Sequence, residues 1–474
     1  MKMLQRIKDN PFKYAGNAIN PLWWAERLVN PYATLKRLGR RRYEALESEY
    51  ISGMLNDMSK GCFREATAFR ASRSLRIIQY AGTHCPYYRR LFRRAAFNPT
   101  SPSDIERLPL LDKALIRQHW DELISDEVGS MDTYTMNTGG STGEPLEFLV
   151  SRGAGHIDSI HQDFVFRTTM GYQEGDTIVA FDGSTVPAPR LRAHQYWVST
   201  GDQDIPYGRL SYSSLYLGAE TMPFYIEHLL ATAPSILRGY PSFINDIAKY
   251  VLENKISIPF RVKGVQLTAE NVHDWQISDI QNAFDTRVFL QYGHSEVCVY
   301  GYTLDDTYEY LCSPFYGYTE VIGEDGQHVS PGQIGEVVVT GFHNYAMPFI
   351  RYRTGDQALF NGNSDGIVRL GRIVGRTQDY LFTKTGEKVA LTALVFGQHY
   401  RCFRNISKWQ LQQDIPGKVK VRMIPGEGFS REDETEIRTR FLDICGIETE
   451  FEYVELIQLT PRGKFRFTVQ NVQV

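Results

Sequence analysis

The sequence has few cysteines and no long apolar run. Its six cysteines are scattered, and no two of them form a Cys-x-x-Cys pair. We therefore expect neither a structural zinc site nor a disulfide framework, and a reducing compartment fits this pattern best. No stretch approaches the length of a membrane span, and the first residues lack the apolar core of a signal peptide. These features predict a cytoplasmic protein.

The chain also lacks an excess of either charge. Its 52 Lys and Arg residues nearly balance 55 Asp and Glu residues, which gives a formal net charge of −3. This balance gives no support to nucleic-acid binding as the main role. A length of 474 residues exceeds the usual size of one hydrophobic core, so we expect two or more domains.

Strand-like and helix-like patterns alternate through the middle of the chain. The expected strands are 179–181, 235–239, 262–267 and 287–291, and the expected helices are 224–232, 242–252 and 273–284. Strands joined in this way by short helical crossovers form a parallel sheet. Ligands of such sheets bind just beyond the carboxyl ends of the strands.

Two further changes of pattern divide the chain. Residues 64–96 have a helical pattern, and the sequence becomes rich in strand signals after Tyr300. Past Arg376 we expect a smaller unit with a hairpin, a helix and a strand, at 409–423, 431–444 and 451–454. The predicted fold is α/β, with a large N-terminal domain of parallel and mixed sheets and helices, residues 1–375, and a small mobile α+β C-terminal domain, residues 376–474. The large domain divides into a helical part, 1–130, and a ligand-binding core, 131–375.

One glycine-rich segment indicates phosphate binding. It contains three glycines and three hydroxyl side chains in six residues: Thr138, Gly139, Gly140, Ser141, Thr142 and Gly143. Glycines let backbone N–H groups turn toward one point, and neighbouring hydroxyls add donors for phosphate oxygens. The segment is not a Walker A loop, because Glu144 stands where a lysine would be expected. The alternative interpretation is a flexible turn between two strands.

Polar groups follow the expected strands at 262–267 and 287–291. After the second of them, Tyr292 can stack on a nucleobase, Ser295 can meet a phosphate, and Glu296 can hold a magnesium ion. After the first, Ala269 and Glu270 offer backbone groups and a carboxylate to an adenine edge. Each motif could also be an ordinary surface turn.

Three more sites lie farther along the chain. Asp356 follows what we expect to be a tight Thr-Gly turn, where its carboxylate suits the two hydroxyls of a ribose. Arg372 and Arg376 supply cations for ribose or phosphate, and Lys464 lies on a short loop near the C-terminus. Taken singly, these three cations are typical of solvated surface charges.

The order of these motifs resembles the adenylate-forming superfamily of acyl-CoA ligases and adenylation domains. Within it the sequence is most similar to the phenylacetate–CoA ligase family and its branch of CapK-like capsular polysaccharide biosynthesis proteins. The segments Pro86–Arg89 and Leu108–Lys113 look like N-terminal signatures of that family, and the resemblance covers roughly residues 85–464.

The resemblance implies a role for each matching position. Residues 138–143 would grip the phosphates of ATP, Ala269, Glu270, Tyr292 and Gly293 would surround the adenine, and Asp356, Arg372 and Arg376 would hold ribose or phosphate. Ser295 would contact the α-phosphate, Glu296 would bind Mg²⁺, and Lys464 would enter with the C-terminal domain as a catalytic residue. The substrate pocket would include Tyr240, Pro241 and His294.

The implied activity is ATP-dependent activation of a carboxylate as an acyl adenylate, followed by transfer to a thiol or an amine. The implied cofactors are ATP and Mg²⁺, with coenzyme A or a phosphopantetheine carrier for the transfer. The partners would be the small-molecule carboxylate and an acyl carrier protein or a sugar acceptor, in surface polysaccharide assembly. The alternatives are an aryl- or acyl-CoA ligase of catabolism and an inactive nucleotide-binding scaffold.

Two positions depart from the family pattern. Glu144 replaces a lysine that many relatives carry in the phosphate loop, so one phosphate cation must come from elsewhere. Gln378 replaces the first acidic residue of the Gly-Arg-x-Asp-Asp hinge, which leaves only Asp379 with a carboxylate there.

Residues 1–42 are the basic exception in an otherwise balanced chain. Ten Lys and Arg side chains face only Asp9 and Glu26 in this stretch, with Trp23 and Trp24 among them. Such a segment suits the surface of an anionic membrane. The alternative is a helical arm that packs its aromatic residues on the body, and three prolines argue against one long amphipathic helix.

A membrane role for residues 1–42 predicts that the protein sediments with anionic vesicles at low salt and releases them at high salt, because salt screens the attraction. A protein that stays in the supernatant at low salt would exclude that role.

Overall fold

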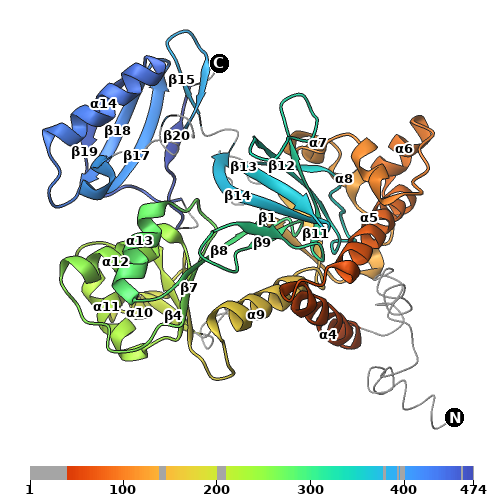
Figure 1. The fold of residues 1–474 in the computed structure, drawn as a ribbon, viewed down its shortest axis with the longest axis horizontal. Helices are drawn as coiled ribbons and strands as arrows, with labels where there is room; N and C mark the ends of the chain where they lie inside the picture. Colours follow the sequence, from red (N-terminus) through yellow and green to blue (C-terminus); the bar gives the residue numbers. More distant parts are fainter. Residues whose placement is uncertain are drawn as a thin grey trace.

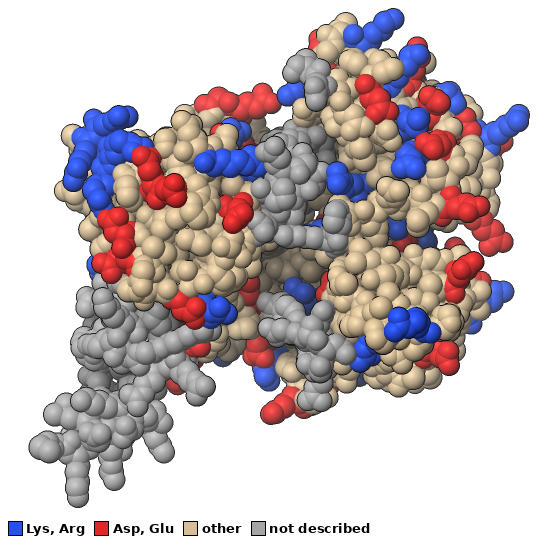
Figure 2. All heavy atoms as spheres, turned by 180° about the vertical axis from the view of Figure 1, so that it is seen from behind, with Lys and Arg blue, Asp and Glu red and all other residues tan. Residues whose placement is uncertain are grey.

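The computed structural model describes residues 40–137, 146–199, 210–376, 380–391, 394, 401–460 and 463–472. Figure 1 shows a large body built around a central sheet and a smaller C-terminal body, in blue, beside α12 and α13. Basic and acidic side chains are interspersed over the back of the molecule (Figure 2), as the near-neutral net charge leads one to expect. No helix in the described ranges is long and apolar enough to cross a membrane.

The N-terminal part of the described chain is helical. Its elements are α4 (Arg40–Ser59), α5 (Arg64–His84), α6 (Pro86–Arg94), η1 (Pro102–Arg107), α7 (Lys113–Gln118), α8 (Trp120–Leu123) and η2 (Val128–Ser130). The helix expected over 64–96 is interrupted at Cys85, which has an extended backbone, and Pro86 begins the next helix. The cause is the ring of Pro86, which disfavours helical backbone at the preceding residue but fits the first position of a helix.

The glycine-rich segment joins two strands that pair with each other. Strands β1 (Thr133–Asn137) and β2 (Glu147–Ser151) form an antiparallel hairpin in which Asn137 faces Glu147. Residues 138–145, which include all six predicted phosphate-loop positions, lie outside the described residues.

The central sheet has twelve strands in the order β11-β12-β13-β14-β10-β9-β8-β7-β6-β3-β5-β4. Its parallel half contains β3 (Ile178–Asp182), β5 (Leu210–Ser213), β6 (Ile236–Gly239), β7 (Gly264–Thr268) and β8 (Val288–Gly293). The other elements of this half are α9 (His156–Met170), α10 (Ala188–Arg192), the antiparallel edge strand β4 (Trp197–Ser199), η3 (Ser214–Tyr216), α11 (Met222–Thr232), α12 (Pro241–Glu253) and α13 (Asp274–Phe284). The predicted α/β fold with a parallel sheet is confirmed.

The other half of the sheet is antiparallel. It contains β9 (Tyr300–Tyr302), β10 (Tyr310–Cys312), β11 (Gly317–Ile322), β12 (Ile334–Gly341), β13 (Tyr352–Ser364) and β14 (Ile367–Arg376). The tight turn expected at Thr354-Gly355 is wrong, because both residues lie inside β13. Gly355 has a φ of +77°, so it bends the strand without reversing it.

A second hydrophobic core lies in the C-terminal part of the chain. It gathers buried side chains from a four-stranded sheet and one helix, among them Leu411, Val421, Met423, Ile437 and Phe441. The elements are β15 (Tyr380–Phe382), β16 (Lys388–Ala390), η5 (Arg401–Asn405), β17 (Ile406–Ile415), β18 (Lys418–Pro425), α14 (Arg431–Cys445), β19 (Glu448–Tyr453) and β20 (Thr468–Gln470). The sheet order is β19-β18-β17-β20, so the chain end pairs with the middle of this unit.

Gly239 closes β6 at a point where no side chain fits. Its φ is +153°, and a Cβ there would lie 2.0 Å from the carbonyl oxygen of Phe181 on the neighbouring strand. We expect Gly239→Ala to lower the free energy of unfolding by at least about 2 kcal/mol, because the parallel pairing of β3 and β6 must shift. Chemical denaturation measures this loss.

Gly153→Ala is the control, because no atom lies within 4 Å of the added Cβ. Its effect should stay within about 0.5 kcal/mol. Equal stabilities of the two variants would contradict the steric argument.

Candidate functional site

Most of the predicted site residues with described side chains meet at the carboxyl edge of the parallel strands. Tyr240 and Pro241 follow β6, Ala269 and Glu270 follow β7, and residues 294–296 follow β8. Because these three strands are parallel neighbours, their ends form one edge of the sheet. The sequence motifs that were far apart along the chain are therefore brought together there.

Glu296 is a buried carboxylate held by two aromatic side chains. The hydroxyl of Tyr352 donates a hydrogen bond of 2.7 Å to its Oε1, and Nδ1 of His294 lies 3.1 Å from its Oε2. Burial alone would raise the pKa of Glu296, but the neighbouring His294 and the Tyr352 hydroxyl outweigh that effect and lower the pKa to about 2. Glu296 therefore stays negatively charged at neutral pH and can meet a cation.

A second hydroxyl–carboxylate contact crosses the same region. The hydroxyl of Tyr292 donates a hydrogen bond of 3.0 Å to Oδ2 of Asp356. Across the strand pair β13–β14, Asp356 stands opposite Arg376, whose side chain lies outside the described part. Tyr292 of β8 thus contacts a carboxylate of β13, and Tyr352 of β13 contacts a carboxylate just after β8, although three strands separate β8 from β13 in the sheet.

Lys464 reaches this edge from the C-terminal unit. Its Nζ donates a hydrogen bond of 3.2 Å to the carbonyl of Ala269 and lies 5.7 Å from the ring centre of Tyr240. The preceding Gly463 has a φ of +70°, and its carbonyl accepts a hydrogen bond of 2.8 Å from the hydroxyl of Ser214. A Cβ on Gly463 would lie 2.2 Å from that hydroxyl oxygen, so the close approach of the lysine loop requires glycine.

Glu270 joins the two parts of the molecule. Its carboxylate accepts the backbone N–H of Ser242 at 3.1 Å and the backbone N–H of Phe465 at 2.7 Å. Burial raises the pKa of Glu270, and the two N–H donors oppose that rise. The first donor belongs to α12 and the second to the lysine loop, so one carboxylate connects both domains.

Charged residues on α12, which no sequence motif indicates, add to this contact. Lys408 forms an ion pair of 2.6 Å with Asp246, and Lys249 donates to the carbonyls of Ile406 and Ser407 at 3.0 and 3.3 Å. Nothing in the local sequence distinguishes these charges from other exposed charges on a helix.

Three other predicted features do not contact the residues described above in the expected way. Arg372 points to the surface, where its guanidinium pairs with Asp274 at 2.9 Å, so it is not gathered with the other residues. Ser295 is half-buried between His294 and Glu296, and Gly293 ends β8. The helix expected over 242–252 begins one residue earlier, at Pro241, and the backbone N–H of Ser242 donates to Glu270.

Among the described residues, no three or more His, Cys, Asp and Glu side chains cluster as a metal site. Magnesium does not need such a cluster, because it keeps several waters and contacts one or two carboxylates together with phosphates. Glu296, charged and buried at the strand edge, fits this kind of binding.

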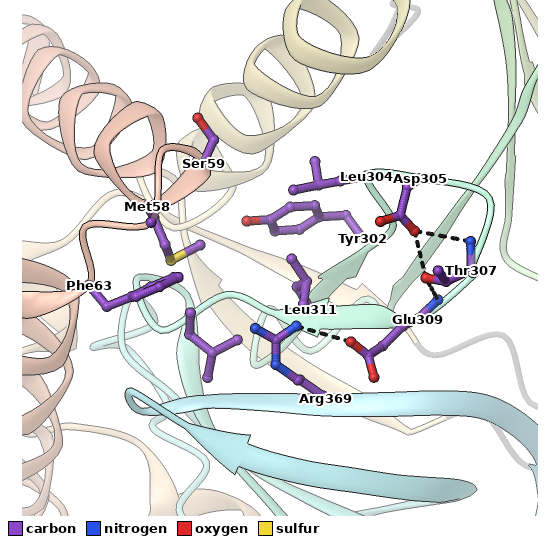
Figure 3. Close-up of a pocket in the computed structure, with 12 residues that line it drawn as sticks. Met58, Ser59, Phe63, Tyr302, Leu304, Asp305, Thr307, Glu309, Leu311 and Arg369 are labelled. Atoms are coloured by element: carbon purple, nitrogen blue, oxygen red, sulfur yellow. Dashed lines mark hydrogen bonds and ion pairs between the residues drawn. The ribbon is translucent and has the colours of Figure 1, made fainter.

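A pocket of about 280 Å³ lies away from these residues. Figure 3 shows it between the end of α4 and the strands near Tyr302 and Arg369, with Arg369 paired to Glu309 at 3.0 Å. None of its lining residues was predicted for the site.

Known proteins with similar sequences agree in kind with one another. Residues 381–471 match the model of the CapK C-terminal domain. Protein CapK of Staphylococcus aureus is 27% identical over 392 residues, which cover 78% of this chain and 81% of that protein. Phenylacetate-coenzyme A ligase of Thermus thermophilus is 23% identical over 355 residues, covering 67% of this chain and 72% of that protein.

Solved structures share the fold. A 2-hydroxyisobutyryl-CoA ligase in the postadenylation state, in complex with 2-HIB-AMP, superposes with a TM-score of 0.64 at 18% identity, covering 87% of this chain and 90% of that one. The acyl acid amido synthetase GH3.15 gives a TM-score of 0.50 at 14% identity, covering 80% and 85%.

The sequence relatives span most of both chains, the C-terminal match falls on the unit that carries Lys464, and the fold agrees with the family resemblance drawn from the motifs. Over most of its length the chain is therefore similar to Protein CapK and to phenylacetate-coenzyme A ligase, and its C-terminal unit matches the CapK C-terminal domain.

Proposed function

We propose that this chain is an ATP-dependent, AMP-forming ligase that activates a carboxylate as an acyl adenylate and passes the acyl group to a thiol or an amine. The observation that carries the proposal is the position of Lys464. A lysine from a second domain lies at the same strand edge as the Tyr292–Asp356 and Tyr352–Glu296 contacts. The names of the relatives, a CoA ligase and an amido synthetase, support the same reaction class.

The first step makes a poor electrophile reactive. An oxygen of the substrate carboxylate attacks the α-phosphorus of ATP, and the bond from that phosphorus to the pyrophosphate oxygen breaks. An acyl–phosphate anhydride forms and pyrophosphate leaves. Negative charge grows on the phosphoryl oxygens, and fixed donors and cations aimed at them stabilise it.

Each residue at the carboxyl edge of the parallel strands would have a separate role in this step. Lys464 would place its ammonium group against the developing charge, and the hydroxyl of Ser295 would donate to an α-phosphate oxygen. Asp356, oriented by the Tyr292 hydroxyl, would accept from the ribose hydroxyls. Residues 138–143 would hold the remaining phosphates through backbone N–H groups and hydroxyls, since Glu144 offers no cation there.

Glu296 would hold Mg²⁺ beside these phosphates. The ion would supply charge neutralisation when bound. The contribution of the chain is to keep the carboxylate ionised, which the His294 and Tyr352 contacts accomplish.

In the second step a thiol or an amine attacks the acyl carbon, AMP leaves, and the nucleophile loses its proton. The acceptor would be coenzyme A, a phosphopantetheine carrier or an amino group. The likeness to Protein CapK favours an acceptor in surface polysaccharide assembly, with catabolic CoA ligation as the alternative. Free coenzyme A that consumes the adenylate would support the catabolic role, and an adenylate that persists until an amine or carrier is added would support the first.

ATP–pyrophosphate exchange over aliphatic, aromatic, hydroxy and amino acids tests the activity itself. Exchange that depends on an added carboxylate is the expected result. ATP binding without exchange for every acid would overturn the ligase proposal and favour an inactive nucleotide-binding scaffold.

Lys464→Ala should slow adenylation by about 10²–10³, because one charge-stabilising group is lost from the transition state. Its affinity for ATP should change little, since the described contacts of the lysine are to Ala269 and Tyr240. Exchange kinetics and nucleotide binding measure the two quantities.

Lys418→Ala, on the same domain and with its side chain 66% exposed, should retain full exchange activity. Undiminished pyrophosphate release by the Lys464 variant would remove the lysine from the mechanism.

Glu270→Ala should weaken the docking of the C-terminal domain, because the N–H groups of Ser242 and Phe465 lose their shared acceptor. Leaving such donors unpaired costs about 1–3 kcal/mol each. We expect a larger radius of gyration in solution scattering and adenylation slowed at least about tenfold.

Glu253→Ala, an exposed carboxylate at the end of α12, is the matched control and should alter neither quantity. Unchanged scattering and rate for the Glu270 variant would show that the carboxylate does not hold the domains together.

A further inference from the structure

A polar layer lies between α9 and the parallel sheet, next to the candidate site. In the second half of α9, Phe166 and Met170 pack with Ile236 and Phe289. Residues two apart on a strand share a face, so Arg238 continues the face of Ile236, and Gln291 continues that of Phe289. Gln266 lies opposite Arg238 on the strand between them. The apolar packing therefore gives way to polar side chains toward the carboxyl edge.

The first half of α9 brings polar groups to the same layer. Asp158 and Gln162 lie one turn apart on the helix, so they share a face. Tyr316 donates a hydrogen bond of 2.6 Å to Asp158, and Tyr300 donates one of 3.0 Å to Gln162. Burial raises the pKa of Asp158, and the nearby charges of Arg238 and His294 oppose this rise. Asp158 is thus within electrostatic reach of both the sheet and the end of β8.

Two amide groups in this layer have fixed orientations and unused donors. Nε of Arg238 donates a hydrogen bond of 2.9 Å to Oε1 of Gln266, and the hydroxyl of Tyr300 donates one to Oε1 of Gln162. Because each amide oxygen faces its donor, each amide nitrogen must point away from that donor. Both side chains are at most 2% exposed, and neither Nε2 has a hydrogen-bond partner among the described residues. Nε2 of His294 is likewise buried without such a partner. A buried donor left unpaired costs about 1–3 kcal/mol, so the two amide groups together indicate a ligand that supplies oxygen acceptors.

We propose that this layer binds the acyl part of the substrate and that the substrate is a hydroxylated carboxylic acid. The proposal rests on the proposed function, because it assigns the carboxylate of that same reaction. The amides of Gln162 and Gln266 donate hydrogen bonds to hydroxyl oxygens of the substrate, and the Asp158 carboxylate accepts a hydrogen bond from a substrate hydroxyl. A second carboxylate on the substrate fits less well, since Asp158 already offsets the charge of Arg238. A hydrocarbon or unsubstituted aryl chain would leave the buried donors unpaired.

ATP–pyrophosphate exchange with matched acids tests the substrate class. Each hydroxy acid is compared with the deoxy acid of the same carbon skeleton and with the corresponding dicarboxylic acid. We expect kcat/KM to be at least about tenfold higher for hydroxy acids, because buried polar groups discriminate strongly against a substrate that cannot pair with them. A preference for the deoxy acids or the dicarboxylic acids would overturn the substrate assignment while leaving the ligase activity intact. If none of the acids supports exchange, that result would overturn the proposed ligase activity and the substrate assignment that rests on it.

Gln266→Met and Gln162→Met test the two amides while keeping the side-chain length. Each variant should reduce the preference for the hydroxy acid over its deoxy partner to within about threefold. A purely structural role would instead lower kcat/KM equally for both acids, and that result would overturn the assignment. Gln173→Met, at an exposed position, is the matched control and should keep the preference of the unmodified protein.

Discussion

The carboxylate of Glu270 is the contact on which the arrangement of the candidate site depends. Glu270 is half-buried, and a carboxylate withdrawn from water is costly unless it is hydrogen-bonded. Its carboxylate accepts two backbone N–H groups, one from each domain. The second donor belongs to the residue directly after Lys464. The bond that satisfies Glu270 therefore also fixes the base of the lysine loop, and Lys464 reaches Ala269 as a consequence.

The same contact is suited to being broken and remade. The described interface near it includes polar contacts, such as the Lys408–Asp246 pair and the two carbonyls that accept from Lys249. Water can replace such partners when they separate, so breaking these contacts costs less free energy than exposing an apolar interface of the same size. Under the proposed function, such an interface would let Lys464 be present for adenylation and absent for acyl transfer, so that one edge serves two reactions.

How far the sequence predicts the molecule depends on whether the determining contacts are local. The four central parallel strands and their helices follow from hydrophobic periodicity, and the structure places them within a few residues of the predicted bounds. Glycine favours turns, which is why a turn is predicted at Thr354-Gly355, but Arg353 and Gln357 on either side of these residues both pair with β12, so the two residues form an irregularity within a strand. Local propensity could not reveal that pairing, since its partners lie elsewhere in the chain.

The residues of the site show the same division. Tyr292, Glu296 and Asp356 could be selected from their motifs, whereas the role of Tyr352 as the partner of Glu296 could not. Its partner lies more than fifty residues away in the sequence, so no local pattern reveals the contact. Arg372 is a different case, because this cation in a promising motif pairs with Asp274 on a helix that the motif does not include.

The reciprocal contacts between β8 and β13 explain why these two strands hold the site even though they are not neighbours. Each contact pairs a buried tyrosine hydroxyl with a carboxylate, so moving either strand would break both of these hydrogen bonds. Burial strengthens such hydrogen bonds and makes their loss expensive. Asp356 and Glu296 are therefore set at a fixed separation before any ligand arrives. In an enzyme that must position a ribose and a triphosphate together, this preorganisation lets the mobile part of the site be confined to the lysine loop.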